Sequence, residues 1–479
     1  MDYVLWGLLG LVVCFLAVIL IRALCFKPKA QSQVSCEEVS FDQDAAVSAL
    51  QQLVQCKTIS YNDHSLEDDA EFQKLIDLLP KLYPDFWANC SLQRFPDRGL
   101  LFHWKGEHDD QPVVMMSHYD VVPAAEELWE KPPFAGIIED GVLWGRGTLD
   151  TKVTMNAALS AANELIKTGF TPQQDIYFAF SGGEEINGPG AIHIVDYFSQ
   201  HGITPALVLD EGGAVVEGVF PGVKEPCAMI GIAEKGMINM HYSVRSGGGH
   251  ASAPLPKSPI TTLSKACRRI VDHPFKMNIS SPVAQMFDTL ARRSTFVYKL
   301  IFANLWCFKP VLDLICRKSG GDMNALVRTT TAFTQAQGSN ARNVIPVEAS
   351  FVSNMRLNPT DSVAGAVAYL RKTVNDPDVE MTVLECDEPS PISETGCDSW
   401  YKVANAVAAT WNGCVVTPYL MVQCSDSRRY RNISRHVYKF SAMDLTKEER
   451  RSIHGNNERI RLEVIARSVE FYIRLLRSC

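Results

Sequence analysis

The sequence predicts an α/β fold in which an open mixed sheet carries helices on both faces, with an inserted α+β domain and an N-terminal transmembrane helix. Apolar runs at 112–116, 175–180 and 206–209 are typical of buried parallel strands. Between the first two runs, 154–167 is rich in Ala and Leu and ends before Gly169, a residue type that commonly follows the last turn of a helix. This strand–helix–strand order predicts a largely parallel sheet.

Composition and charge argue against two classes of protein, mainly disordered chains and nucleic-acid-binding proteins. Hydrophobic residues make up 46% of the 479 residues and charged residues 21%, which is ordinary for globular proteins and excludes a mainly disordered chain. The formal net charge is −8, and contacts with phosphates need a basic surface. We therefore expect no nucleic-acid partner.

The N-terminus carries an unbroken apolar run of 18 residues, 4–21, which Arg22 ends. This run is long enough to cross a bilayer as a helix. A cleaved signal peptide fits less well, because no Lys or Arg precedes the run and no small-residue cleavage site follows it. We expect a membrane anchor at 1–30, a polar tether at 31–40, and a single-pass membrane protein.

The membrane face is left open by the sequence. Basic residues follow the apolar run, and the positive-inside rule then places the bulk of the chain in the cytoplasm. The 14 cysteines form no Cys-x-x-Cys motif, which weakly favours a reducing compartment. A large translocated domain can override the charge bias.

The remainder of the chain divides by its hydrophobic pattern. Helical spacing is found at 45–54 and 70–79, whereas 237–244 and 347–357 approximate the period-two alternation of antiparallel strands. The expected domains are a first catalytic part at 41–232, an inserted α+β lid or dimerisation domain at 233–387, and a second catalytic part at 388–479.

Side chains that can bind a metal follow each of the expected strands. They are, in chain order, His118, Asp120, Asp150, Glu184, Glu185, Asp210, Glu211 and the distant His454. Open α/β sheets bind ligands at the carboxyl ends of their strands, so we expect several of these side chains to converge. Nitrogen and carboxylate donors suit Zn²⁺, and also Co²⁺ or Mn²⁺. Five ligands with one bridging carboxylate satisfy two ions.

These motifs resemble the co-catalytic di-zinc metallopeptidase family that includes carboxypeptidase S, aminoacylase and glutamate carboxypeptidase. The matching segments are 117–123, 144–152, 183–185, 209–213, 249–252, 343–346, 425–428 and 454–460. The resemblance runs from about residue 41 to the C-terminus. It is greatest for the carboxypeptidase S branch, which also holds a secreted N-fatty-acyl-amino-acid synthase/hydrolase.

The resemblance implies a di-zinc exopeptidase fold with two Zn²⁺ per subunit and a role for each ligand. Asp150 would bridge the metals, with Glu185 and His454 completing one site and His118 and Asp210 the other. Spacing from Glu185 within the carboxypeptidase S branch favours Asp210, whereas other branches place a Glu here, so the choice between Asp210 and Glu211 stays open.

The resemblance also implies the catalytic and binding side chains. Glu184 would be the general acid and base, and Asp120 would orient His118. His250 would stabilise the oxyanion, often from a partner subunit, which suggests a homodimer formed through the inserted domain. The candidates to hold a substrate carboxylate are Asn343, Arg356 and Arg428.

We therefore expect a membrane-anchored di-zinc amidohydrolase or carboxypeptidase that acts on small molecules. It would cleave the amide bond next to a free C-terminal α-carboxylate in short peptides or N-acyl amino acids. The apolar segment 296–317 has three interpretations: helices packed over the lid, an acyl channel, or a membrane-facing patch. Rival functions are an N-fatty-acyl-amino-acid hydrolase/synthase specifically, an anchored aminopeptidase, and a catalytically silent binding protein. The family's secreted members favour an extracytoplasmic location.

Overall fold

The computed structural model describes the chain except for residues 1, 32–33 and 35. Three of these lie in the expected tether, 31–40, so that prediction falls partly outside the described residues. Within its described part, the Gln31 side chain donates a hydrogen bond to the carbonyl of Val416, and Val39 packs against the hydrophobic core. These flanking contacts hold the described tether residues against the body of the protein.

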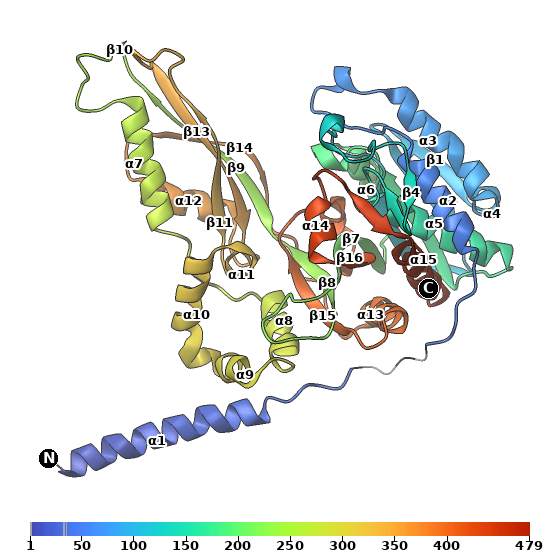
Figure 1. Ribbon diagram of the computed structural model, residues 1–479, viewed down its shortest axis with the longest axis horizontal. Helices are drawn as coiled ribbons and strands as arrows, with labels where there is room; N and C mark the ends of the chain where they lie inside the picture. Colours follow the sequence, from blue (N-terminus) through green and yellow to red (C-terminus); the bar gives the residue numbers. More distant parts are fainter. Residues whose placement is uncertain (1, 32–33, 35) are drawn as a thin grey trace.

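An eight-stranded mixed sheet forms the centre of the molecule (Figure 1). Its strands are, in spatial order, β1 (Ser91–Phe95), β2 (Gly99–Trp104), β6 (Gln174–Ser181), β3 (His108–His118), β7 (Leu207–Val216), β16 (Val437–Leu445), β8 (Cys227–Glu234) and β15 (Val415–Met421). The pairs β3–β6, β3–β7, β7–β16 and β8–β15 are parallel, whereas β1–β2 and β2–β6 are antiparallel. The parallel strands predicted from the three apolar runs are confirmed.

Helices cover both faces of this sheet. The helices of one layer are α2 (Gln43–Val54), α3 (Asp69–Leu82), α4 (Pro84–Asn89), α5 (Lys152–Lys167), α13 (Asp398–Thr410) and α15 (Leu462–Arg477). The opposite face packs against α6 (Gly190–Gln200). Successive residues of β3 alternate between the layers: Val113 and Met115 face the first, and Val114 and Met116 face α6. This double burial explains the continuous apolar run.

A second sheet stands beside the central sheet in Figure 1, and we call this sheet with its helices the lid, after the role expected for the insertion. Its four antiparallel strands are β11 (Thr330–Gln337), β13 (Glu348–Leu357), β9 (Gly236–Arg245) and β14 (Glu380–Asp387). The helices α7 (Pro259–Asp272) and α12 (Val363–Val374) close a separate hydrophobic core over this sheet. At the end of the lid, β10 (Gly249–His250) pairs with β12 (Val344–Ile345).

Residues of the predicted insertion at 233–387 pack into two separate hydrophobic cores. Four helices of the insertion contribute no residue to the lid core. They are α8 (Ser281–Ala291), α9 (Phe296–Ala303), α10 (Leu305–Ser319) and α11 (Gly321–Val327). Buried side chains of these helices, such as Phe287 and Leu326, join a core cluster with Val415 and Leu420 of β15. The insertion therefore contributes to both the lid and the body that holds the central sheet.

The N-terminal helix α1 (Asp2–Cys25) projects from the body of the molecule and contacts it at α9 (Figure 1). Its segment Tyr3–Cys25 has a mean hydropathy of 3.0 and is long and apolar enough to cross a membrane. Signal sequences share this length and composition.

Candidate metal centre

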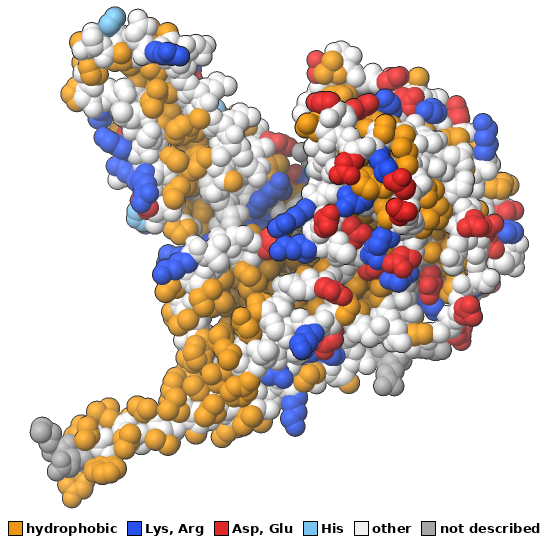
Figure 2. Space-filling model, in the orientation of Figure 1, with side chains coloured by type: hydrophobic (Ala, Val, Ile, Leu, Met, Phe, Trp, Pro, Cys, Tyr) orange, Lys and Arg blue, Asp and Glu red, His pale blue; other side chains and the backbone are white. Residues whose placement is uncertain are grey.

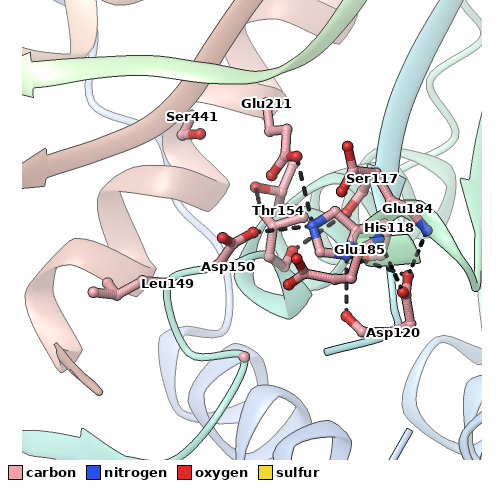
Figure 3. Close-up of polar contacts among 12 residues, drawn as sticks. Ser117, His118, Asp120, Leu149, Asp150, Thr154, Glu184, Glu185, Glu211 and Ser441 are labelled. Atoms are coloured by element: carbon pink, nitrogen blue, oxygen red, sulfur yellow. Dashed lines mark hydrogen bonds and ion pairs between the residues drawn. The ribbon is translucent and has the colours of Figure 1, made fainter. Parts of the chain in front are cut away.

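The predicted cluster gathers where β3, β6 and β7 present their polar residues (Figure 3). His118 is the last residue of β3 and is 2% exposed. Its Nδ1 lies 3.0 Å from the carbonyl oxygen of Asp120. Its Nε2 lies 2.9 Å from Asp150 Oδ1 and 3.5 Å from Glu211 Oε1. The second ring nitrogen therefore faces carboxylates, as a metal ligand would.

Asp150 lies between the two histidines. Its Oδ1 faces His118, and its Oδ2 lies 3.0 Å from Nε2 of His454, which follows α14 (Lys447–Ser452). The same His454 nitrogen lies 3.0 Å from Glu185 Oε2. A carboxylate that presents one oxygen to each of two metal-binding side chains has the arrangement needed to bridge two ions.

The structure separates the two candidates on β7. Glu211 faces His118, and its carboxylate, that of Glu184 and the His118 ring present atoms within 4.8 Å of one another. Asp210 Oδ2 instead accepts a hydrogen bond of 3.0 Å from the backbone nitrogen of Ser427. Of this pair, Glu211 makes the contact with His118, at 3.5 Å.

Asp120 organises the turn that carries the two glutamates, which form the short helix η3 (Glu184–Ile186). Its Oδ1 accepts a hydrogen bond of 3.1 Å from the backbone nitrogen of Glu184, and its Oδ2 accepts one of 3.2 Å from that of Glu185. The Ser60 hydroxyl donates to the same Oδ2 at 2.7 Å. Asp120 thus positions His118 through its carbonyl and the glutamate pair through its carboxylate.

Glu458 is a positioning residue that the sequence did not single out. It precedes β17 (Arg459–Arg461), which pairs with β5 (Val142–Trp144), itself paired with β4 (Ile137–Glu139). The Glu458 side chain accepts hydrogen bonds from the backbone nitrogens of Gly147, Leu149 and Asp150 and forms a 2.6 Å ion pair with Arg146. It therefore fixes the loop that carries Asp150. Local sequence contains no signal for this contact, because its partners are more than 300 residues away.

The charges of the cluster are unbalanced. Burial, together with the neighbouring carboxylates of Asp426 and Glu211, raises the pKa of Glu184 well above its ordinary value. Burial and the negative charge of Asp150 raise the pKa of Glu211 to about 8. Burial opposes protonation of His118, but the surrounding carboxylates, Glu211 first, outweigh it and raise its pKa. A buried excess of carboxylates around two imidazoles is chemically suited to divalent cations.

Two of the predicted substrate-binding residues lie close to each other. The Arg428 side chain donates a 2.5 Å hydrogen bond to Oδ1 of Asn187, the residue after η3, and belongs to η4 (Asp426–Asn432). Arg356 on β13 donates a hydrogen bond to Cys424 Sγ at 3.1 Å. Burial raises the pKa of this thiol, and the positive charges of Arg356 and Arg428 both oppose the rise. The two guanidinium groups therefore meet where the lid joins the central body.

The structure does not bring His250 or Asn343 to the cluster. His250 lies in β10, at the end of the lid farthest from the central sheet (Figure 1), and its Nδ1 is 2.7 Å from the Ser252 hydroxyl. Asn343 is exposed next to β12, and its carbonyl accepts a hydrogen bond from Ala251. Their catalytic and binding roles remain predictions.

An open α/β sheet whose strand ends collect two histidines and several carboxylates defines the class of metal-dependent hydrolases. Comparison with known proteins gives the particular family. Residues 114–478 match the Peptidase M20 family, described as peptidase family M20/M25/M40, and the chain belongs to this family. It is a hydrolytic enzyme whose family implies a divalent metal, typically zinc.

Relatives with curated descriptions cover most of the chain. The N-fatty-acyl-amino acid synthase/hydrolase PM20D1 of Xenopus tropicalis is 34% identical over 98% of this chain and 94% of its own length. The probable carboxypeptidase S-like 2 of Dictyostelium discoideum is 33% identical over 88% of this chain and 82% of its own length. The branch predicted from the motifs is confirmed.

Solved structures of low identity share the fold. The M20 family metallo-carboxypeptidase Sso-CP2 from Sulfolobus solfataricus has a TM-score of 0.66 at 16% identity and covers 90% of this chain and 98% of its own. Human carnosine dipeptidase 1 has a TM-score of 0.63 at 13% identity, covering 91% and 96%.

Proposed function

We propose that the chain is a membrane-anchored di-zinc amidohydrolase that cleaves the amide bond of N-acyl amino acids next to their free α-carboxylate. The observation that carries this proposal is the position of Asp150, with one oxygen toward His118 and the other toward His454. Two ions at this position would have one shared ligand, which is the arrangement of a co-catalytic pair.

The metal ligands follow from the contacts. His118 and Glu211 would hold one ion, Glu185 and His454 the other, and Asp150 both. Glu211 takes the place predicted for Asp210, because its carboxylate rather than that of Asp210 lies beside His118. Zinc bound here would polarise the substrate carbonyl and increase the acidity of water.

Glu184 would move the proton. Its carboxyl group lies partly buried beside His118 and Glu211. It would accept the proton of the attacking water and deliver it to the leaving nitrogen. The two hydrogen bonds from η3 to Asp120 keep this carboxyl group in position.

A free substrate carboxylate would bind the paired arginines. Arg356 and Arg428 meet between the lid and the central body, and guanidinium groups bind carboxylates through two parallel hydrogen bonds.

The preference for an acyl substrate is supported by the relatives. PM20D1 of Xenopus tropicalis, which the chain matches over 98% of its length, is described as an N-fatty-acyl-amino acid synthase/hydrolase. The helix α1 also supports a lipophilic substrate, because its length and hydropathy suit a membrane anchor. A peptide carboxypeptidase is the second candidate, favoured by the carboxypeptidase S-like relative.

A hydrolysis screen of the full-length protein in detergent tests the proposal. The panel pairs dipeptides with N-acyl amino acids from acetyl to oleoyl, with zinc or with chelator, and mass spectrometry measures the released amino acid. We expect chelator-sensitive hydrolysis that rises with acyl length. Glu184→Gln should retain zinc and lose about 10²–10⁴ of the rate.

The outcomes separate the candidates. Hydrolysis confined to dipeptides would assign the chain to the peptide carboxypeptidases. Hydrolysis that persists in Glu184→Gln would remove the proposed proton carrier. Zinc-loaded protein that hydrolyses no member of the panel would support a binding protein instead.

A further inference from the structure

A band of exposed apolar side chains covers the outer face of α9 and α10. We call it the leaflet face, and it consists of Phe296, Val297, Trp306, Val311, Leu314 and Ile315, which are 46–62% exposed. Figure 2 shows that this apolar surface is continuous with that of α1. Soluble proteins rarely expose contiguous apolar surface of this kind unless it binds a partner.

Specific contacts attach α1 to these two helices. The Arg22 guanidinium donates hydrogen bonds of 3.1 and 2.9 Å to the carbonyl of Ala303. The buried Asn304 amide donates to the carbonyl of Ile19 at 3.0 Å. The rings of Phe15 and Trp306 meet edge to face with 5.8 Å between their centroids. The leaflet face is therefore fixed along one side of α1.

We propose that the leaflet face is inserted into one leaflet of a lipid bilayer, alongside α1. The proposal rests on the anchor assigned to α1 above. Phe15 precedes Cys25 by ten residues, which is about 15 Å along a helix and about half of a hydrocarbon core. If α1 crosses the bilayer, the Trp306 ring that contacts Phe15 lies within the same leaflet.

The charges around the leaflet face suit a bilayer. Arg317 and Lys318 occupy the last turn of α10, beyond the apolar residues. Near the end of α1, Lys29 pairs with Asp288 at 2.7 Å. Basic residues at such borders lie at the headgroup level, and the exposed Lys309 within α10 has a long stem that can reach the same level.

Insertion would hold the base of the lid at the membrane surface. Asp313 on α10 pairs with the buried Arg328, which lies two residues before the lid strand β11. Arg328 also donates a 2.9 Å hydrogen bond to the carbonyl of Phe275. These contacts connect the leaflet face to the junction of the lid, and an amphiphilic substrate would meet the enzyme where it leaves the bilayer.

Quenching of tryptophan fluorescence by brominated lipid tests the proposal on the full chain. The protein is reconstituted into phosphatidylcholine vesicles with and without bromine on the acyl chains. Trp6 reports on α1 and Trp306 on the leaflet face. We expect Trp6→Phe and Trp306→Phe each to lose part of the quenching seen in the unmodified protein. Trp87→Phe, on α4, is the matched control and should lose none.

Further outcomes test the insertion of the leaflet face separately from the membrane anchor. Adding Leu314→Trp to Trp306→Phe should restore quenching, which shows that the lost signal comes from the leaflet face and not from a damaged fold. Quenching that depends on Trp6 but not on Trp306 or Leu314→Trp would overturn the inference and keep the anchor; a protein partner or second copy on this face gives this result. Quenching that depends on none of them would overturn both.

Discussion

At the scale of single residues, the neighbours Asp210 and Glu211 on β7 make different contacts. Asp210 accepts a hydrogen bond from the backbone of Ser427 and so supports η4, whereas Glu211 faces His118. The family resemblance favoured Asp210 by its spacing from Glu185 and left Glu211 as the alternative. These contacts support Glu211 as the proposed ligand.

A matched pair of variants tests this assignment. Glu211→Gln should lose about one of two zinc ions per chain, because an amide is a poor zinc ligand in place of a carboxylate. Asp210→Asn should retain both ions. Zinc content measured by elemental mass spectrometry after dialysis decides between them, and the reverse result would restore Asp210 as the ligand.

Glu458 shows how a residue outside the metal cluster shapes it. Its buried carboxylate accepts hydrogen bonds from three backbone nitrogens and from Arg146. Removing one partner of such a buried pair leaves the other charge uncompensated.

Glu458→Gln should therefore destabilise the protein by about 3–5 kcal/mol and lower the rate, because the Asp150 loop loses its support. Urea unfolding measures the first effect. The control is Glu448→Gln, whose exposed carboxylate pairs with Arg459 on the surface; it should change stability by less than about 1 kcal/mol. Equal effects of the two variants would contradict the role of Glu458.

At the scale of elements, the strands were predictable where burial imposes a pattern. The run at 112–116 lies inside β3 because both faces of that strand are covered, and the alternation at 237–244 lies inside β9. The helix expected at 154–167 is confirmed as α5, Lys152–Lys167. The packing of α8–α11 against β15 was not predictable, since apolar helices carry no mark of the core that they join.

The lid places His250 far from the metal ligands within one chain. If a second copy supplies this side chain, two defective variants should complement each other. His250→Ala alone should lose about 10²–10³ of the rate, as expected for an oxyanion donor. Co-expressed with Glu184→Gln under separate tags, it should form doubly tagged dimers in which one site of two is wild-type, with about half of the wild-type rate.

The activity of the doubly tagged complex is the measurement. If the His250→Ala protein is as active as the wild type, the predicted catalytic role of His250 is wrong. Two inactive variants that fail to complement would place the side chain in its own chain and require the lid to close.

At the scale of the whole molecule, the buried carboxylates connect metal binding to stability. Glu211 has an ordinary pKa of 4.5, which burial raises to about 8 in the folded chain. Between these values the folded state holds a proton that the unfolded state releases, so the free energy of unfolding falls as the pH rises. The raised pKa of Glu184 acts in the same direction.

Metal-free protein should therefore lose thermal stability as the pH rises from about 5 to about 8, whereas zinc-loaded protein should lose less or gain. Zinc binds the deprotonated ligands and becomes more favourable over the same range. Thermal midpoints with chelator and with zinc across this range are the measurement. A metal-free protein that becomes more stable with rising pH would contradict the charge excess of the site.

The sequence by itself determined the family, the mixed α/β class and the set of side chains that can bind metal, because these depend on local composition and on motifs read along the chain. Only the tertiary structure decided that Glu211 rather than Asp210 faces His118, that Glu458 holds the Asp150 loop, and that α9 and α10 lie along α1. Each of these depends on contacts between residues distant in the sequence or on the direction of a side chain. The physical reason is that strand register and helix packing, which no local pattern specifies, set those directions.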